Sequence, residues 1–218
     1  MTRRISKYPA VQGSKPVWWR DESGSAIVEL GLILPVFLLL FFGLIDFGRL
    51  TFHFVTSQKA MQVAARVAAV RPPACAGVPE FLGRGPADLV PAPEFGTSCR
   101  AGTGICANPG IVECSGSASN PTAEEIWNIV RGTLPNNAAI GNLTFVYSSD
   151  PQLGFLGGPY TPIVTVELDD VDFEFISPLG DLVGLAGGTA PSGLGANIRF
   201  PSMSVSLPAE DLAAGNNG

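Results

Sequence analysis

A long run of apolar residues dominates the first quarter of the chain. Residues 30–45 contain no charged side chain, and the wider stretch 26–47 carries charges only at Glu29 and Asp46. An α-helix rises about 1.5 Å per residue, so this stretch is just long enough to cross about 30 Å of hydrocarbon. The pattern therefore predicts one transmembrane helix at residues 25–48.

A cleaved secretory signal is the alternative for this segment. The apolar part of such a signal is usually about 7–15 residues long and is followed by a cleavage site with small residues. Here the run is longer, and the charged sequence Asp46-Phe47-Gly48-Arg49 follows it. Both features favour a helix that stays in the membrane.

The helical pattern continues beyond the apolar run. Apolar or small residues recur about every 3.6 positions, at Leu50, Phe54, Ser57, Met61, Ala64, Ala65 and Ala68. Arg71-Pro72-Pro73 then ends the pattern, because proline cannot continue a helix. We expect a single helix from about residue 27 to 70, in which residues 49–71 extend from the membrane and carry an outer domain on their apolar stripe.

Two features stand out within this helix. Pro35 frees a backbone carbonyl where the lipid offers no water to satisfy it, so a local kink or a neighbouring helix is expected there. Asp46 and Arg49 lie three residues apart, and such side chains can pair on one helical face. We expect this pair at the outer end of the span.

The remainder of the chain predicts short elements between turns rich in glycine and proline. Residues 72–121 are predicted to be a loop, and residues 122–218 a small domain. A short helix is expected from Thr122, because Thr122 and Glu125 have the spacing of a capping box. Strands are predicted at residues 143–148, 163–175 and 202–207. The fold class is therefore α+β, a long N-terminal transmembrane helix extending into a small domain with a short helix and an antiparallel sheet.

The strand predicted at residues 163–175 changes its alternation half-way. Apolar residues occupy even positions up to Leu168 and odd positions from Val171 onward. A β-bulge at Asp169 and Asp170 would restore one continuous buried face. The acidic residues of this strand would then face water; they are Glu167, Asp169, Asp170, Asp172 and Glu174. A calcium site is the alternative, but the chain lacks a D-x-D-x-D-G loop, so we predict a solvated face and no metal site.

The segment at residues 177–195 is rich in glycine and leucine. We expect a mobile loop, or a surface that a partner covers. The candidate contact residues are Leu179, Leu182, Val183 and Leu185.

Charge is distributed unevenly along the chain. Residues 1–24 hold five basic and two acidic side chains, whereas the remainder holds eight basic and seventeen acidic ones. Because basic residues flank membrane helices on the cytoplasmic side, residues 1–24 are predicted to be a cytoplasmic leader and the C-terminal domain to be extracytoplasmic. The acidic domain argues against a nucleic-acid partner.

All four cysteines lie in the predicted loop, at Cys75, Cys99, Cys106 and Cys114. On the oxidising side of a membrane, four cysteines indicate two disulfides, with three possible pairings. A zinc site is the rival interpretation. The intervening gaps of 23, 6 and 7 residues contain no C-x-x-C, which favours disulfides.

The chain offers little for catalysis. His53 is its one histidine, and Lys59 is its one lysine beyond the leader. Nucleophile–base machinery is therefore poorly supplied in the outer domain, and no GxSxG, HExxH, Walker A or dinucleotide fingerprint occurs. We predict no enzymatic activity, no catalytic residue and no cofactor.

The stretch GSAIVELGLILPVFLLLFFGLIDFGRL resembles the N-terminal signature of TadE-like proteins, pseudopilin-type components of the Tad (tight adherence, Flp pilus) system. The likeness lies in the charged leader, the glycine, the glutamate five places after it, Leu-x-Leu-Pro, the apolar block and Asp-Phe-Gly-Arg. It covers about residues 20–70. The sequence FISPLG is similar to the end of the main strand in TadE-like domains.

The resemblance implies processing by a prepilin peptidase, which cuts after glycine on the cytoplasmic side, here between Gly24 and Ser25. It also implies that Glu29 pairs with the freed amine of a neighbouring subunit, since opposite charges attract strongly in a low dielectric. The alternative is that Glu29 faces a protein partner or the headgroups and that no cleavage occurs. Leu30 departs from the tyrosine of Flp-type major pilins, which favours a minor component.

The sequence thus predicts a minor pilin-like protein of the bacterial inner membrane, acting in Tad pilus assembly and surface adherence. Its partners would be the lipid bilayer, the prepilin peptidase, other Tad pilus subunits and the inner-membrane platform, with helix packing around Pro35 and Gly43. The second hypothesis is an uncleaved, membrane-anchored binding or adhesion module outside the cytoplasm.

Overall fold

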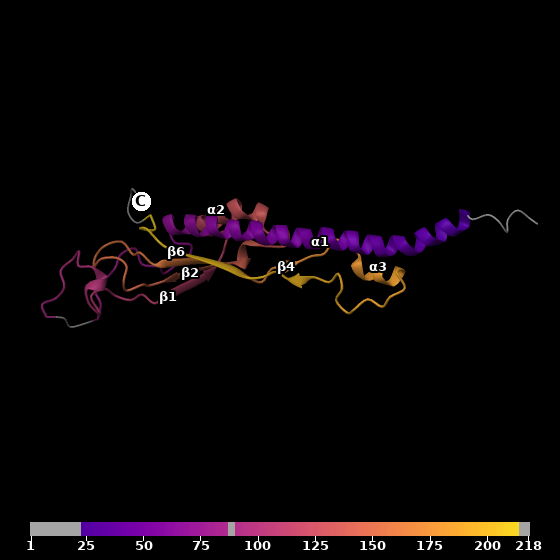
Figure 1. The fold of residues 1–218 in the computed structure, drawn as a ribbon. Coiled ribbons are helices and arrows are strands. Elements are labelled where there is room, and N and C mark those ends of the chain that lie inside the picture. Colours follow the sequence, from indigo (N-terminus) through magenta and orange to yellow (C-terminus); the bar gives the residue numbers. More distant parts are fainter. Residues whose placement is uncertain (1–22, 87–89, 214–218) are drawn as a thin grey trace, which may run out of the picture. The chain divides into compact units, whose positions relative to one another are not determined.

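A computed structural model describes residues 23–86 and 90–213 of the chain. The predicted basic leader, residues 1–24, lies almost entirely outside the described residues. The order of helices and strands is α1 (Ser23–Val70), β1 (Ile111–Ser115), α2 (Pro121–Val130), β2 (Leu143–Ser148), β3 (Ile163–Leu168), β4 (Asp172–Phe173), α3 (Leu179–Leu185), β5 (Ile198–Arg199) and β6 (Met203–Pro208) (Figure 1). Short 3₁₀ turns occupy Cys99–Ala101, Arg131–Thr133 and Ile140–Asn142. The α+β class is confirmed.

The fold divides into two compact units, and α1 contributes to both. Among the described residues, the first comprises residues 23–43 with Pro178–Leu194, so it holds the N-terminal part of α1 together with α3. The second comprises the described parts of residues 44–177 and 195–213, and it holds the C-terminal part of α1, α2 and β1 to β6.

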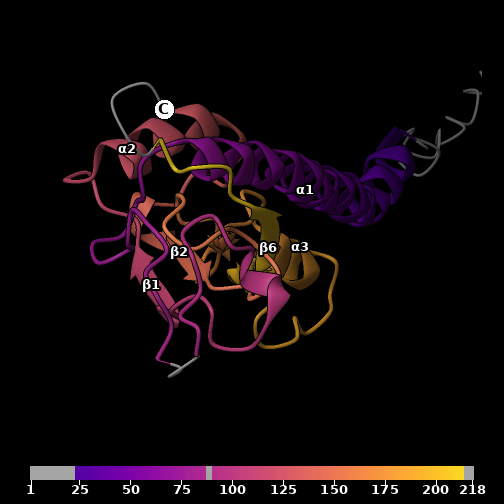
Figure 2. The same ribbon diagram turned by 90° about the vertical axis from the view of Figure 1, so that its left-hand side faces the viewer.

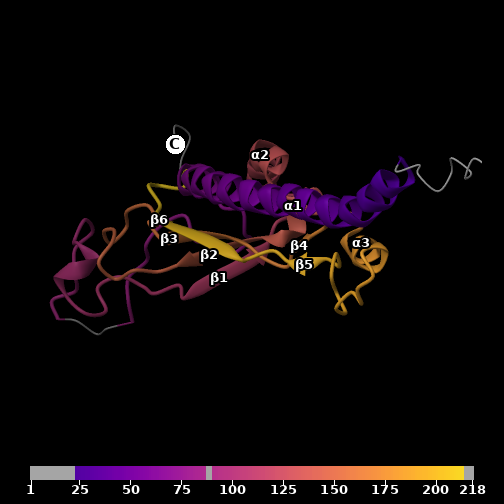
Figure 3. The same ribbon diagram turned by 45° about the vertical axis from the view of Figure 1, so that its right-hand side comes forward.

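The second unit is a four-stranded antiparallel sheet covered on one side by helices. Its strand order is β1-β2-β3-β6. Figures 2 and 3 show α1 and α2 on the same side of this sheet. Apolar side chains alternate along β2 and β3, because successive residues of a strand point to opposite faces. One face of the sheet is therefore buried under the helices.

The helix side of this core is built largely from alanine and methionine. The fully buried apolar residues of α1 are Met61, Ala64, Ala65 and Ala68. They belong to the same apolar cluster as Phe145 and Val166 of the sheet. Small side chains let the helix backbone approach the sheet closely, while the aromatic rings of β2 supply the volume.

The predicted strand at residues 163–175 is wrong as a single strand. The alternation does slip where expected, but no bulge repairs it. Asp170 adopts a left-handed conformation with φ 58°, and the chain leaves the main sheet after Leu168. β4 then pairs with β5 in a separate two-stranded sheet, in which Phe173 is buried. Thus the chain keeps Leu168 and Phe173 both buried by changing sheets.

The N-terminus of α2 also differs from the prediction. Asn120, not Thr122, caps the helix: its side-chain oxygen accepts a hydrogen bond from the Ala123 N–H at 3.0 Å. Thr122 is buried, and Glu125 forms an ion pair with Arg71 at 2.9 Å instead of completing a capping box. Pro121 at the first helical position fits this start, because its fixed φ suits a helix and it has no N–H to satisfy.

Three further elements were not predicted. β1 lies inside the segment expected to be loop, at residues 72–121, and β5 lies in the glycine-rich region before β6. The helix α3 occupies part of residues 177–195, which were expected to be a mobile loop or a covered surface. Leu179 and Leu182 of α3 are buried, so this segment packs within its unit.

Candidate functional site

The N-terminal part of α1 presents an almost fully exposed apolar surface. None of its most apolar stretch is buried, and Leu44, at the start of the second unit, is 75% exposed. A core helix of a water-soluble fold buries such side chains, whereas a membrane helix leaves them to the lipid. This helix, at Gly24–Val70, is long and apolar enough to cross a membrane.

Gly24 and Ser25 lie in the first turn of α1. The first N–H groups of a helix have no intrahelical partner, so this turn can unwind at little cost. A Cβ built on Gly24 would meet no atom within 4 Å. Nothing within the described part of the chain therefore requires glycine at this position.

Glu29 is exposed one turn later. Its Oε1 accepts a hydrogen bond from the Ser25 hydroxyl at 3.2 Å. The two residues that the sequence analysis linked through processing thus lie on the same helical face. No ion pair with Glu29 is found among the described residues, so its charge is available to a group outside them.

The two predicted helix-packing residues lie on one face of α1. Pro35 lies inside the helix, which continues through it, and both Pro35 and Gly43 are half-buried. A Cβ on Gly43 would meet no atom within 4 Å, so the described chain does not need a glycine there either.

Asp46 is the one charged side chain fully buried in the described structure. Arg49 donates to its Oδ1 at 3.1 Å, as predicted from their spacing. Two further donors were not predicted from the sequence: the Ile176 N–H at 3.4 Å and the Ser177 N–H at 3.1 Å. Arg49 also lies over the Phe173 ring, 5.4 Å from its centroid. A buried carboxylate needs several donors, and here the segment after β4 supplies them.

His53 lies one turn further along α1. Its Nδ1 is buried and has no hydrogen-bond partner among the described residues. Burial, and then the positive charge of Arg49, lower the pKa of His53 below its ordinary value of 6.5, against a smaller opposing effect of the Thr133 backbone. The imidazole is therefore a neutral packing residue beside Phe173, whose ring centroid is 6.1 Å away.

The four cysteines form two disulfides in the second unit. Cys75 pairs with Cys114, 39 residues apart, and Cys99 pairs with Cys106, 7 residues apart. The first bond joins the chain that follows α1 to β1, and the second closes a small loop. This is one of the three pairings that the sequence left open.

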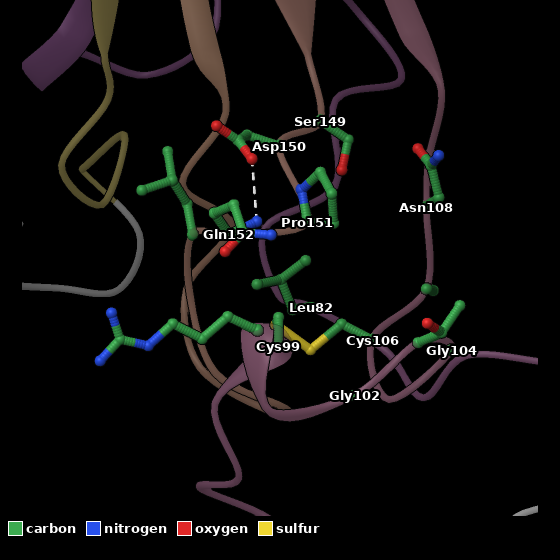
Figure 4. Close-up of a pocket in the computed structure, with 14 residues that line it drawn as sticks. Leu82, Cys99, Gly102, Gly104, Cys106, Asn108, Ser149, Asp150, Pro151 and Gln152 are labelled. Carbon is green, nitrogen blue, oxygen red and sulfur yellow. Dashed lines mark hydrogen bonds between the residues drawn. A yellow bond between two sulfur atoms is a disulfide. The ribbon is translucent and has the colours of Figure 1, made fainter.

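A pocket of about 330 Å³ lies beside the Cys99–Cys106 disulfide (Figure 4). Ser149 and Asp150, which follow β2, line it, and Asp150 accepts a hydrogen bond from the Gln152 N–H at 2.8 Å. Its lining includes no histidine or lysine, so it offers no nucleophile–base pair of the usual kinds. No metal-binding cluster is found within residues 23–86 and 90–213.

The described residues thus define the class of protein: one exposed helix that could cross a membrane, followed by a small domain that contains two disulfides. A family model described as TadE-like protein matches residues 24–69, which covers nearly all of α1. The resemblance recognised in the sequence is thereby confirmed over this helix. No curated protein and no solved structure shows a significant match to the chain. The family match indicates a membrane protein associated with a Tad pilus.

Proposed function

We propose that this protein is a minor pilin-like component that assists assembly of a Tad/Flp-type pilus and hence surface adherence, without catalysing a reaction. The observation that carries the proposal is the exposed apolar part of α1 with Glu29 near its start. Isolated in lipid, a carboxylate near the edge of a membrane helix is unfavourable. In an assembly, a positive group from another subunit can offset that cost.

The proposed processing step creates such a group. A prepilin peptidase hydrolyses the Gly24–Ser25 peptide bond: one water is consumed, Gly24 becomes the C-terminal carboxylate of the released leader, and Ser25 gains a protonated α-amine. That amine pairs with Glu29 of a neighbouring subunit in a low dielectric. The exposure of Glu29 supports this step, because no ion pair among the described residues uses its carboxylate and its charge is available to a group of another subunit.

The orientation follows from charge. The basic residues of the leader favour a cytoplasmic N-terminus, and the two disulfides favour an oxidising compartment for the domain. The membrane would be the bacterial inner membrane, where the peptidase and the assembly platform reside.

Intact-mass measurement on membrane-extracted protein tests the proposal. In cells with a working peptidase, we expect a chain that lacks residues 1–24. Gly24→Val should block the cut, because a branched side chain hinders close approach of the backbone to the protease. Gly31→Val is the matched control, since Gly31 is also helical with no atom within 4 Å of an added Cβ. A full-length wild-type chain would contradict processing and favour an uncleaved anchored module.

A further inference from the structure

We propose that the segment Pro178–Leu194, with α3 at its start, inserts into the lipid headgroup region beside α1 and forms a second membrane contact. This inference rests on α1 spanning a membrane, but it requires neither cleavage nor pilus assembly. The partner is a phospholipid surface.

The segment Pro178–Leu194 packs beside the predicted transmembrane part of α1. Pro178–Leu194 and the N-terminal part of α1 form one compact unit, and Figures 1 and 3 show α3 beside α1. The half-buried residues of α1 in this unit lie on one helical face, namely Pro35, Leu38, Leu39, Phe42 and Gly43. On α3, Leu179 is 5% and Leu182 is 6% exposed. α3 therefore covers this face of the predicted transmembrane helix.

The segment contacts α1 near the outer end of the uncharged run. Leu38 and Phe42 lie seven and three residues before Ile45, where the uncharged run ends. At about 1.5 Å per residue, α3 lies roughly 5–10 Å inside that end. Interfacial helices bury their apolar faces to a similar depth, about 5–10 Å. A segment packed here meets lipid on its outer side if α1 is in a bilayer.

The composition of the segment suits a lipid surface. Among the 17 residues of Pro178–Leu194, Asp181 is the one that carries a charge. Leu185 is 73% and Leu194 is 40% exposed, so the unit leaves large apolar side chains uncovered. In water this exposure is unfavourable, whereas at the acyl boundary it is favourable.

Backbone hydrogen bonding supports the same placement. The end of α3 is closed by its own chain: the Gly188 N–H donates to the Val183 carbonyl at 3.0 Å, and the Gly187 N–H to the Gly184 carbonyl at 3.1 Å. Gly187 has φ 79°, a conformation that glycine adopts without strain. The irregular chain that follows contains Thr189 and Ser192. Lipid-exposed irregular backbone does not occur in the hydrocarbon core, so the segment lies close to the headgroup–acyl boundary, on the shallow side of the range of about 5–10 Å.

Fluorescence quenching in reconstituted vesicles tests the inference. The full-length protein, with Trp18, Trp19 and Trp127 replaced by Phe, is placed in phosphatidylcholine–phosphatidylglycerol vesicles. Leu185→Trp should then emit at shorter wavelength and lose most of its emission to lipid brominated near the headgroup, and less to lipid brominated near the chain end. Ile111→Trp is the matched control, because Ile111 of β1 is 70% exposed. It should emit as in water and remain unquenched.

The proposal is overturned if Leu185→Trp behaves like the Ile111 control while alkaline extraction shows that α1 is embedded. Stronger quenching by the deeper bromine would equally contradict an interfacial position. Intact mass of the same samples reports leader cleavage separately, so failure of the lipid contact and failure of pilin-type processing are distinguishable.

Discussion

The carboxylate of Asp46 accepts the backbone N–H of Ser177 at 3.1 Å, although 131 residues separate them in the sequence. The bond joins α1 to the chain immediately after β4. Arg49 donates to the same carboxylate. The buried side chain of Asp46 thus holds the Arg49 guanidinium and the backbone after β4 against α1.

Asp46→Ala is therefore expected to destabilise the second unit by about 2–4 kcal/mol, because it leaves two backbone N–H groups and Arg49 without an acceptor. Chemical denaturation in detergent, followed by near-UV circular dichroism, measures the loss. Asp46→Asn should lie between wild type and Asp46→Ala, since an amide oxygen still accepts. Asp172→Ala removes an exposed acid and serves as control. Equal stability of Asp46→Ala and the control would contradict this role.

The free energy of unfolding should depend on pH through the protonation of His53. Its pKa in the folded protein is lowered from 6.5 by burial first and by Arg49 second. The unfolded chain therefore binds a proton at a higher pH than the folded one, and the free energy of unfolding falls as pH decreases through about 6.5. His53→Gln should flatten the profile between pH 7 and 5. Thermal unfolding of both proteins between pH 7 and 5 measures this profile. If stability falls with decreasing pH as steeply in His53→Gln as in the wild type, another group causes the pH dependence.

The two disulfides should differ in their contribution to stability. In the chain-entropy account, a crosslink stabilises more when it closes a longer loop. Replacing Cys75 and Cys114 by serine should cost about 4 kcal/mol, and replacing Cys99 and Cys106 about 2 kcal/mol, given separations of 39 and 7 residues. Denaturation of the two double variants compares them directly. A larger loss of stability in the Cys99/Cys106 variant would show that strain in the folded state or residual structure in the unfolded state outweighs the effect of loop length.

Asp170 should prefer a residue that tolerates a left-handed backbone. Its φ is 58°, which is unfavourable by roughly 1–2 kcal/mol for side chains branched at Cβ. Asp170→Val is expected to lower stability by about that amount, whereas Asp170→Gly should be close to neutral because its ion pair with Arg199 is exposed. Asp172→Val, in the regular strand β4, is the comparison. A destabilised Asp170→Gly variant would instead indicate that the Arg199 pair matters.

Glu29 should matter for association and not for folding. Its side chain is exposed, and its one hydrogen bond in the described structure is to Ser25. Glu29→Ala should leave the unfolding midpoint and the leader cleavage unchanged, but should abolish co-purification with pilus subunits from native membranes. Ser25→Ala, which removes only the hydroxyl, should retain co-purification. A Glu29→Ala protein that is cleaved and still co-purifies would exclude the pairing role.

Local patterns predicted the long elements well. The end of α1 at Val70 follows from the two prolines after Arg71, and β2 from the alternation between Leu143 and Ser148. Both signals lie within one stretch of sequence. The predicted cap of α2 failed because Asn120 and Thr122 are both good caps, and Pro121 at the first helical position was the signal that separates them.

Non-local relationships were harder to predict. β1 is short, lies between glycines, and pairs with a strand some thirty residues later, so its own sequence carries little alternation. The acceptor role of Asp46 depends on backbone groups at Ile176 and Ser177, which no spacing on α1 reveals. Likewise, two disulfides follow from the count of cysteines, but their pairing depends on the folded path of residues 75–114.

The Cys75–Cys114 bond has a mechanical consequence. Five residues after α1 ends, the chain is covalently tied to β1, which in turn is hydrogen-bonded to β2. The chain beyond α1 therefore has a covalent route through a sulfur–sulfur bond to the edge strand of the sheet, which bypasses most of the 38 residues between the two cysteines. A protein built in this way can bear load at the junction of helix and domain while the intervening loop remains free to vary.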